Sequence, residues 1–518
     1  MQFDIDTATP PQGTVRDWID HRADADGAAI SHLFPGSDAA PLSWAELRER
    51  ARDIAGHLTG LGVARGESVA LMMPNGRSSI LCLMGALYGG FRLTAINLVA
   101  GAEAMGYALS HSEARFAFVD HDQHPLFEAA SAAHPNEVTA LAVGALDRID
   151  WPEGTQAAPL HDVGAQDHAL LMYTSGTTGR PKGVIHTQAS LLAGGWTPTV
   201  AHALTPADRA LCVLPIYHIN GLCVTVMGPL VSGGSVAMSP RFSASRFWQD
   251  CAEVQATWFS VVPTIISHLL HGPHEPDAET RKRLRFGRSA SSALAPDVQT
   301  GFETRFDVPI VETMGLTETA AQILSNPLPP GNRKIGSPGV PYGNEVTVLD
   351  ERLRPLGPGH EGELAVRGPN VMIEYFKNPQ ATTESLTPSG WLRTGDLGRL
   401  DDDGYVFIAG RLKELIIKGG ENIAPREIDE ALYAHADVIE AAAFARPCKS
   451  YGERVEAAVR LREGSAVVPA DLIELCRNRL GNFKCPDRIH IMDDLPKGPS
   501  GKIQRLKLAS LTQVAESA

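Results

Sequence analysis

Short apolar strands alternate with helical segments through roughly the first third of the chain, and this alternation limits the folds open to it. Residues 67–73, 115–119 and 169–173 are apolar enough to form buried strands. A helix is expected to begin after Ser43, with Glu46 completing a capping box, and to end near Gly60. Strands separated by helices favour layers built on parallel sheets, so we expect an α/β fold.

Two later regions have a different pattern. Glycine, proline and aspartate turns separate short strands at 345–349, 362–366 and 405–408, which predicts a small antiparallel β unit. After Arg411 the pattern changes again, to an α+β domain. Its expected helices and strands are 426–435, 438–444, 455–461, 472–480 and 488–492. The sequence therefore predicts a large domain over residues 1–411 and a small C-terminal domain over residues 412–518.

Composition excludes several classes of protein. The chain has 46 Lys and Arg against 60 Asp and Glu, a net charge of −14, which argues against binding nucleic acid or an anionic membrane. Its seven cysteines are scattered and form no CxxC pair, as expected of a reducing compartment without a disulfide framework or zinc ribbon. Residues 1–11 lack the basic and apolar parts of a signal peptide, so we expect a cytoplasmic protein.

One segment is long and uncharged enough to be compared with a membrane span. Residues 211–240 contain no Lys, Arg, Asp or Glu. Pro215, Pro229 and the pair Gly233 and Gly234 interrupt it, however. We interpret the segment as a strand, a buried loop, a core helix and a turn, and expect no membrane span.

The sequence YTSGTTGRPKG at 173–183 is the strongest chemical signal. It follows a predicted buried strand and combines glycines, hydroxyls and one lysine. Glycines allow backbone N–H groups to turn toward an anion, and the hydroxyls and the lysine add donors and charge. The pattern predicts a phosphate-binding loop without Walker A spacing. A flexible surface linker is the alternative, but such linkers rarely follow a buried strand.

Three further motifs are weaker when each is taken alone. Glu318 offers a hard oxygen ligand for Mg²⁺ and Thr317 a hydroxyl for a phosphate, although a solvated glutamate is as common. Asp396 can accept the hydroxyls of a ribose and Arg411 can hold a hydroxyl or phosphate, whereas the alternative for Asp396 is a turn residue. Lys502 lies in a loop rich in Gly, Pro and Ser, where a lysine is usually just solvated.

Together and in this order, the four motifs resemble the adenylate-forming (AMP-binding) superfamily of acyl- and aryl-CoA synthetases, luciferases and peptide-synthetase adenylation domains. The resemblance extends from about residue 14 to residue 507. It implies a large N-terminal domain of layered α/β subdomains with a small β unit, followed by a mobile α+β domain. It also implies a ligase that uses ATP, Mg²⁺ and coenzyme A to convert a small-molecule carboxylic acid, fatty acids among the candidates, into an acyl-adenylate and then an acyl-CoA. A homodimer is a further expectation.

The resemblance assigns roles residue by residue. The expected ATP or AMP contacts are Thr174, Ser175, Gly176, Thr177, Thr178, Gly179, Lys182, Ser292, Glu312, Thr313, Met314, Gly315, Thr317, Asp396, Arg411 and Lys502. The expected catalytic residues are Thr174, His218, Glu318 and Lys502, with Glu318 also the metal ligand. The expected acyl pocket contains His218, Asn220 and Gly315. Lys413 corresponds to the hinge between the domains, and Gly419 and Gly420 to the loop near the pantetheine of CoA.

Which acid is activated is less constrained. In the segment PIYHING at 215–221, His218 is expected near the substrate carboxylate, the alternative being a core histidine, and Asn220 can contact a polar group on the acid. Amino-acid-activating relatives place an aspartate here, and its absence disfavours amino acids. Met314 stands where many relatives place a tyrosine against adenine, and methionine also packs on rings.

Two other functions remain open at this point. A stand-alone adenylation enzyme that loads a carrier protein shares every motif, and pyrophosphate exchange with and without CoA, followed by thioester detection, separates the two. A non-catalytic nucleotide-binding or scaffold protein on the same fold is the second alternative. The presence of both Glu318 and Lys502 argues against it, because a degenerate site loses such residues first.

Overall fold

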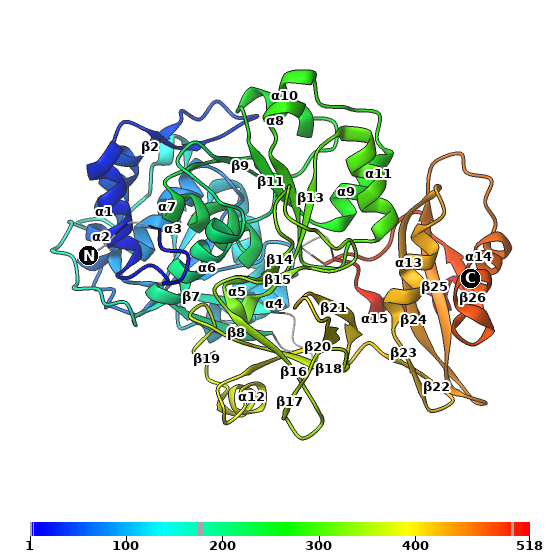
Figure 1. Cartoon of the computed structure of the whole chain (residues 1–518). Helices are drawn as coiled ribbons and strands as arrows, with labels where there is room; N and C mark the ends of the chain where they lie inside the picture. Colours follow the sequence, from blue (N-terminus) through cyan, green and yellow to red (C-terminus); the bar gives the residue numbers. More distant parts are fainter. Residues whose placement is uncertain (1–2, 4, 136, 175–180, 499–501, 518) are drawn as a thin grey trace.

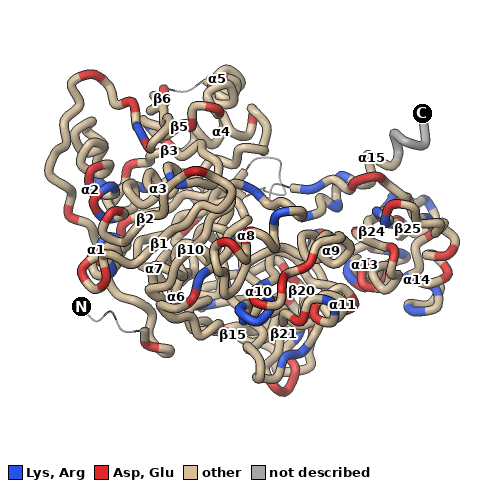
Figure 2. Tube along the Cα trace, turned by 90° about the horizontal axis from the view of Figure 1, so that it is seen from above, with Lys and Arg blue, Asp and Glu red and all other residues tan. Residues whose placement is uncertain are grey.

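The computed structural model describes residues 3, 5–135, 137–174, 181–498 and 502–517, with side chains up to Thr512. A large lobe contains the N-terminus, and the C-terminal segment from Ile416 onward forms a smaller lobe beside it (Figure 1). Acidic and basic residues lie interspersed along the chain in both lobes (Figure 2). The predicted fold class, a large layered α/β domain with a smaller C-terminal α+β domain, is confirmed.

Two mainly parallel sheets form the centre of the large lobe. The first has the order β19 (Glu374–Tyr375), β8 (Lys182–Thr187), β7 (His168–Thr174), β4 (Arg92–Ala95), β3 (Ser68–Met72), β5 (Phe116–Asp120) and β6 (Thr139–Val143). The second has the order β15 (Val340–Pro341), β14 (Ala321–Ser325), β13 (Ile310–Leu316), β12 (Phe286–Ser289), β11 (Trp258–Val261), β9 (Arg209–Cys212), β10 (Ser235–Met238), β1 (Ile30–Leu33) and β2 (Leu42–Ser43). The strands predicted at 67–73, 115–119 and 169–173 all belong to the first sheet.

The helices of the large lobe cover and separate these sheets. They are α1 (Val15–Asp26), α2 (Trp44–Gly60), α3 (Arg77–Gly89), α4 (Ala102–His111), α5 (His124–Ala133), α6 (Gln188–Ala201), α7 (Gly228–Ser232), α8 (Phe247–Glu253), α9 (Pro263–His271), α10 (Ala278–Arg283), α11 (Pro296–Phe306) and α12 (Pro379–Ser385). Short 3₁₀ turns lie at His121–Gln123, Ala145–Asp147 and Thr317–Thr319. Helices α3 and α6 are buried on almost every face, and one apolar core joins them to both sheets.

The antiparallel unit and the C-terminal domain complete the fold. The antiparallel unit contains β17 (Pro355–Leu356), β16 (Glu345–Leu349), β18 (Gly362–Arg367), β20 (Leu392–Leu400) and β21 (Val406–Arg411), as the turn pattern predicts. The C-terminal domain contains β22 (Ile416–Lys418), β23 (Glu421–Ile423), α13 (Pro425–Tyr433), β24 (Val438–Cys448), β25 (Gly452–Leu461), α14 (Pro469–Lys484), β26 (Arg488–Ile491) and α15 (Arg505–Ser517). Its helices and sheet share a separate apolar core.

The uncharged segment at 211–240 folds as expected. It contains the end of β9, a buried π-helix at Asn220–Met227, helix α7 and strand β10, with Gly233 in the left-handed region between the last two. Across the described ranges, none of the helices combines the length and apolar character needed to cross a bilayer.

The capping box predicted for α2 is only half correct. The Ser43 hydroxyl accepts from the Glu46 N–H at 3.2 Å, as a cap does. The Glu46 carboxylate, however, pairs with Arg77 at 2.5 Å instead of returning to the helix N-terminus. A charged guanidinium is a stronger partner for a carboxylate than a backbone N–H, and the approach of α3 brings Arg77 there.

Candidate active site

Two adjoining cavities lie where the parallel strands of both sheets end, the edge at which ligands usually bind in α/β folds. The first, about 190 Å³, lies between the large lobe and the C-terminal domain. The second, about 330 Å³, extends into the large lobe. Residues shared by the two linings join them into one site: Ser291, Gly315, Leu316, Arg411 and Lys502.

Most residues predicted from the sequence meet in this site. Those in the first lining are Ser292, Glu312, Thr313, Met314, Gly315, Asp396, Arg411 and Lys502. Those in the second are Thr174, Lys182, His218, Asn220, Gly315, Thr317, Glu318, Arg411 and Lys502. The predicted contacts Ser175, Gly176, Thr177, Thr178 and Gly179 fall outside the described residues. Lys413, Gly419 and Gly420 line neither cavity and are exposed on the side of the C-terminal domain.

A close approach of two strands explains the glycine at 315. The register of β13 against β14 shifts between Met314 and Gly315, at the wall shared by the cavities. A Cβ at Gly315 would lie only 1.7 Å from the Ala321 carbonyl oxygen, so no side chain fits. Nearby, Ser291 and Ala321 adopt φ of 75° and 85°, the left-handed region that non-glycine residues rarely occupy. Such strain is typical of functional sites.

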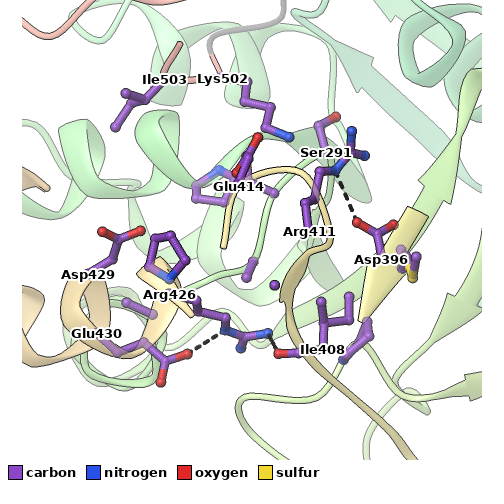
Figure 3. A pocket seen from close by; sticks show the side chains of 18 of the residues that line it. Ser291, Asp396, Ile408, Arg411, Glu414, Arg426, Asp429, Glu430, Lys502 and Ile503 are labelled. Carbon is purple, nitrogen blue, oxygen red and sulfur yellow. Dashed lines mark hydrogen bonds and ion pairs between the residues drawn. The ribbon is translucent and has the colours of Figure 1, made fainter. Parts of the chain in front are cut away.

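Asp396 and Arg411 face each other from neighbouring strands. They are register partners of β20 and β21, and the Arg411 Nε donates to the Asp396 Oδ1 at 3.0 Å (Figure 3). Burial raises the pKa of Asp396, an effect that Arg411 and Lys502 only partly offset. Asp396 is the foremost cause of the raised pKa of Arg411. The pair presents an acceptor and a guanidinium to the same cavity, which suits a ribose and its phosphate.

Lys502 comes from the C-terminal domain and extends into the cavity toward Arg411 and Ser291 (Figure 3). Burial is the largest cause of its lowered pKa, and repulsion by Arg411 adds to it, while Glu414 and Asp396 act in the opposite direction. An anion bound beside Lys502 would stabilise its ammonium form, because an opposite charge offsets the cost of burying a charged group.

Glu318 is held in place from several directions. Its Oε1 accepts from the Tyr375 hydroxyl at 2.7 Å, and its carbonyl accepts from the Met372 N–H at 2.7 Å. Beside it, the His186 Nε2 donates to the Thr317 carbonyl at 2.7 Å. The Lys182 ammonium lies 4.8 Å from the centre of the Tyr375 ring. Tyr375 was not predicted from the sequence, because an isolated tyrosine in a two-residue edge strand gives no signal for such a role.

Glu312 is a buried carboxyl group at the back of the first cavity. Its Oε1 accepts from the Leu294 N–H at 3.0 Å, whereas its Oε2 has no hydrogen-bond partner among the described residues. Burial raises its pKa, and Arg426 partly offsets this. The unpartnered Oε2 of Glu312 offers a polar contact, and the buried Met314 beside it offers an apolar surface. A purine base makes contacts of both kinds.

The deep end of the second cavity contains an unpredicted buried cation. Arg288, on β12, is 1% exposed and lines the cavity. Its Nη1 donates to the Asn220 Oδ1 at 2.8 Å and the Ser260 hydroxyl at 3.2 Å, and its Nε to the Gln322 Oε1 at 3.2 Å. Asn220 begins the π-helix, a rare element that is frequent at functional sites. Arg288 was not predicted from the sequence, because a single arginine in a four-residue strand is its one signal there.

Comparison with known proteins identifies the family. The chain matches the model for AMP-binding enzymes over residues 19–376 and the model for the C-terminal domain of AMP-binding enzymes over residues 427–502. A sulfoacetate–CoA ligase from Cupriavidus necator is 46% identical over 480 residues, 92% of this chain and 93% of that protein. An oxalate–CoA ligase from Arabidopsis thaliana is 37% identical over 476 residues, 90% of this chain and 92% of that protein.

A solved structure agrees with these relatives. ATP-bound MatB from Rhodopseudomonas palustris superposes with a TM-score of 0.87 at 29% identity, over 96% of this chain and 99% of MatB. The chain belongs to the AMP-binding enzyme family. Within it, the chain is an AMP-forming acid–CoA ligase, which uses ATP and CoA to ligate a carboxylic acid through an acyl-adenylate.

Replacement of Gly315 tests the wall between the cavities. Gly315→Ala should force β13 and β14 apart, lower stability by about 1–3 kcal/mol and slow adenylation, because the displaced wall borders both cavities. Thermal unfolding and single-turnover pyrophosphate release measure these effects. Gly144→Ala is the control, since a Cβ there meets no atom of the described residues within 4 Å. Equal behaviour of the two variants would contradict the steric argument.

The lowered pKa of Lys502 predicts a pH dependence. If its charge is needed, adenylation should fall as pH rises through that pKa, below the value of about 10.4 for an ordinary lysine. In Lys502→Arg, which stays protonated, the alkaline fall should move to higher pH although the maximal rate is lower. The profile of single-turnover pyrophosphate release measures this, and an unmoved alkaline fall would assign it to another group.

Proposed function

We propose that this ligase activates a short carboxylic acid that carries a second anionic group at its far end. The observation that carries the proposal is the buried guanidinium of Arg288. Among the described residues, no Asp or Glu carboxylate lies within ion-pair distance of it, and its hydrogen-bond acceptors are neutral. A buried charge without a counter-charge costs several kcal/mol, which a substrate anion would offset.

Arg288 keeps its charge despite this burial. Desolvation lowers the pKa of its guanidinium to about 9, which leaves it protonated at neutral pH. The Asn220 Nδ2 provides a further donor beside it, because this buried amide group has no hydrogen-bond partner in the described part of the chain. A buried cation and an unpartnered N–H donor in the lining of a cavity suit a sulfonate or a second carboxylate. They disfavour the alkyl tail of a fatty acid.

The acids named for the relatives support this class. Sulfoacetate and oxalate, named for the two ligases above, each carry two acidic groups a short distance apart. A 2-succinylbenzoate–CoA ligase from Bacillus licheniformis, 32% identical over 467 residues, is named for another doubly acidic substrate. Because the 46% identical relative is named for a sulfonate, sulfoacetate is the first acid to test.

The proposed first half-reaction joins the two cavities. ATP would lie with its base against Met314 and Glu312, its ribose on Asp396 and its terminal phosphates toward Thr174 and Lys182. The substrate carboxylate, near His218, attacks the α-phosphorus, and pyrophosphate leaves with the electrons of the broken P–O bond. Two anions meet in this step, so the Lys502 ammonium would bind both and stabilise the charge that develops between them.

The residues around Glu318 suit Mg²⁺. Thr317 and Glu318 supply hard oxygen donors, and one carboxylate suffices when substrate phosphates and water provide the other ligands. Within the described ranges, no cluster of three or more His, Cys, Asp or Glu side chains forms a self-sufficient metal site. When bound, the ion would supply charge neutralisation for the phosphates of ATP. Tyr375 would orient the Glu318 carboxylate.

In the proposed second half-reaction the thiol of CoA attacks the acyl carbon and AMP leaves. Lys502 occupies the site in the structure, so the C-terminal domain would move before the thiol enters. Lys413 lies in the exposed turn after β21 and would be the pivot, between domains 1–411 and 412–518. Gly419 and Gly420, both at positive φ in the turn of β22 and β23, would then approach the pantetheine. A cytoplasmic enzyme and a homodimer remain predictions.

Arg288→Met tests the substrate class. For the doubly acidic substrate we expect kcat/KM to fall at least about 100-fold, or about 2.7 kcal/mol, while activity with propionate is retained or rises. Thermal stability should not fall much, because an uncompensated charge is removed. AMP release in the presence of CoA, with sulfoacetate, oxalate and propionate, measures the preference.

Arg92→Met is the matched control for this test. Arg92 is also buried and donates to Ser68 and Ser112, but it lies outside both cavities. Its loss should lower stability and leave the preference between acids unchanged. A wild-type enzyme that prefers propionate, or an Arg288→Met variant that loses all acids equally, would contradict the proposal.

Lys502→Ala tests the two-step scheme. Adenylation should fall by about 100- to 1,000-fold, since a charge partner of the transition state is lost. Thioester formation from supplied acyl-adenylate should stay largely intact, because the thiol attack does not use this ammonium. Pyrophosphate release and thioester yield are measured separately on one preparation. An equal loss in both half-reactions would show that Lys502 serves both.

A further inference from the structure

Helix α9 of the large lobe lies directly against strand β24 of the C-terminal domain. The Ser267 hydroxyl donates to the Ile439 carbonyl at 2.6 Å. One residue further along each element, the His268 Nε2 donates to the Glu440 Oε1 at 3.0 Å. Two polar contacts therefore cross the boundary between the lobes, and the residues that make them line neither cavity.

Several basic side chains lie around the carboxylate of Glu440. Its side chain is completely buried, and three basic groups surround it: the His268 Nε2 at 3.0 Å, the Lys497 Nζ at 2.9 Å and the Arg460 Nη1 at 3.6 Å. Burial alone would raise the pKa of Glu440, but the bonds from His268 and Lys497 outweigh it and hold the pKa below its usual range. Glu440 is therefore a carboxylate.

Lys497 connects this carboxylate to the loop of Lys502. Residues Lys497 and Ile503 form an isolated antiparallel bridge. The Gly498 N–H donates to the Lys502 carbonyl at 2.7 Å, and the Gln504 N–H donates to the Pro496 carbonyl at 2.7 Å. The backbone on both sides of Lys502 is thus fixed to the backbone around Lys497, whose ammonium is bound by Glu440 and also by Asp494.

We propose that Glu440 and His268 are positioning residues, which couple the seating of the C-terminal domain to the placement of Lys502 for adenylation. The proposal rests on the role of Lys502 given above. Lys497 and Arg460 belong to the same domain as Glu440 and stay with it, whereas His268 belongs to the large lobe. When the domain moves, the Ser267 bond to Ile439 and the His268 bond to Glu440 both break, but Glu440 keeps its two other cations. The contact can therefore open and close at small cost.

The bond between His268 and Glu440 can break without leaving either side chain without a partner. Glu440 keeps Lys497 and Arg460. The His268 side chain is about one-third exposed, so water can replace Glu440 as its partner. A purely structural contact would stabilise the protein without regard to the reaction step. A positioning contact should favour the arrangement with Lys502 in the site, and so affect adenylation and not the thiol step.

The test uses His268→Ala in the full-length chain. We expect single-turnover pyrophosphate release to slow about tenfold, while thioester formation from supplied acyl-adenylate is unchanged or faster. His268→Gln, whose amide can still donate to Glu440, should restore most of the adenylation rate. His271→Ala is the control, since the bonds of the His271 Nδ1 to described residues stay within α9, to the Ser267 carbonyl at 2.7 Å and to the Ser267 hydroxyl.

The outcomes separate this inference from the proposed function. If Lys502→Ala abolishes adenylation and His268→Ala slows it selectively, both hold. If Lys502→Ala abolishes adenylation but His268→Ala changes neither half-reaction, or both equally, the coupling through Glu440 is wrong and the role of Lys502 stands. If adenylation survives Lys502→Ala, the proposed function fails and the inference fails with it.

Discussion

The guanidinium of Arg288 is buried without a carboxylate partner among the described residues, and three structural elements around it supply its neutral hydrogen-bond acceptors. Arg288 sits on a short central strand between two neighbouring parallel strands, and the π-helix brings Asn220 against it. Gln322, from the strand beyond Gly315, holds its other side. A buried charge without a counter-charge costs several kcal/mol, and in the proposed function an anionic group of the substrate would offset this cost.

A second cation, Lys502, lines both cavities and belongs to the C-terminal domain. Lys502 reaches the cavity with the C-terminal domain seated on α9, and burial together with Arg411 lowers its pKa. In the proposed function, the two cations would contact opposite ends of the substrate. Arg288 would bind the end that does not react, and Lys502 the carboxylate and phosphate that do. Binding energy gained at the first end helps to orient the second for reaction.

Much of this site could be predicted from the sequence because its motifs are local. Thr174, Glu318, Asp396, Arg411 and Lys502 each lie in a short pattern of glycines and polar residues, and the family resemblance gives their order. The antiparallel unit was predictable for the same reason, from closely spaced turns. Arg288 was not, since one arginine in a short strand has no pattern around it. Contacts such as that of His268 with Glu440, 172 residues apart, depend on how domains pack.

The proposed substrate class depends on one contact, that of Arg288 with an anionic group at the far end of the acid. A crystal structure with a non-hydrolysable adenylate of a short doubly acidic substrate tests it most directly. The account predicts a distal oxygen within about 3.2 Å of the Arg288 guanidinium and another near the Asn220 Nδ2. A distal group that points to solvent or to Lys182, with Arg288 still bonded only to neutral side chains, would contradict it.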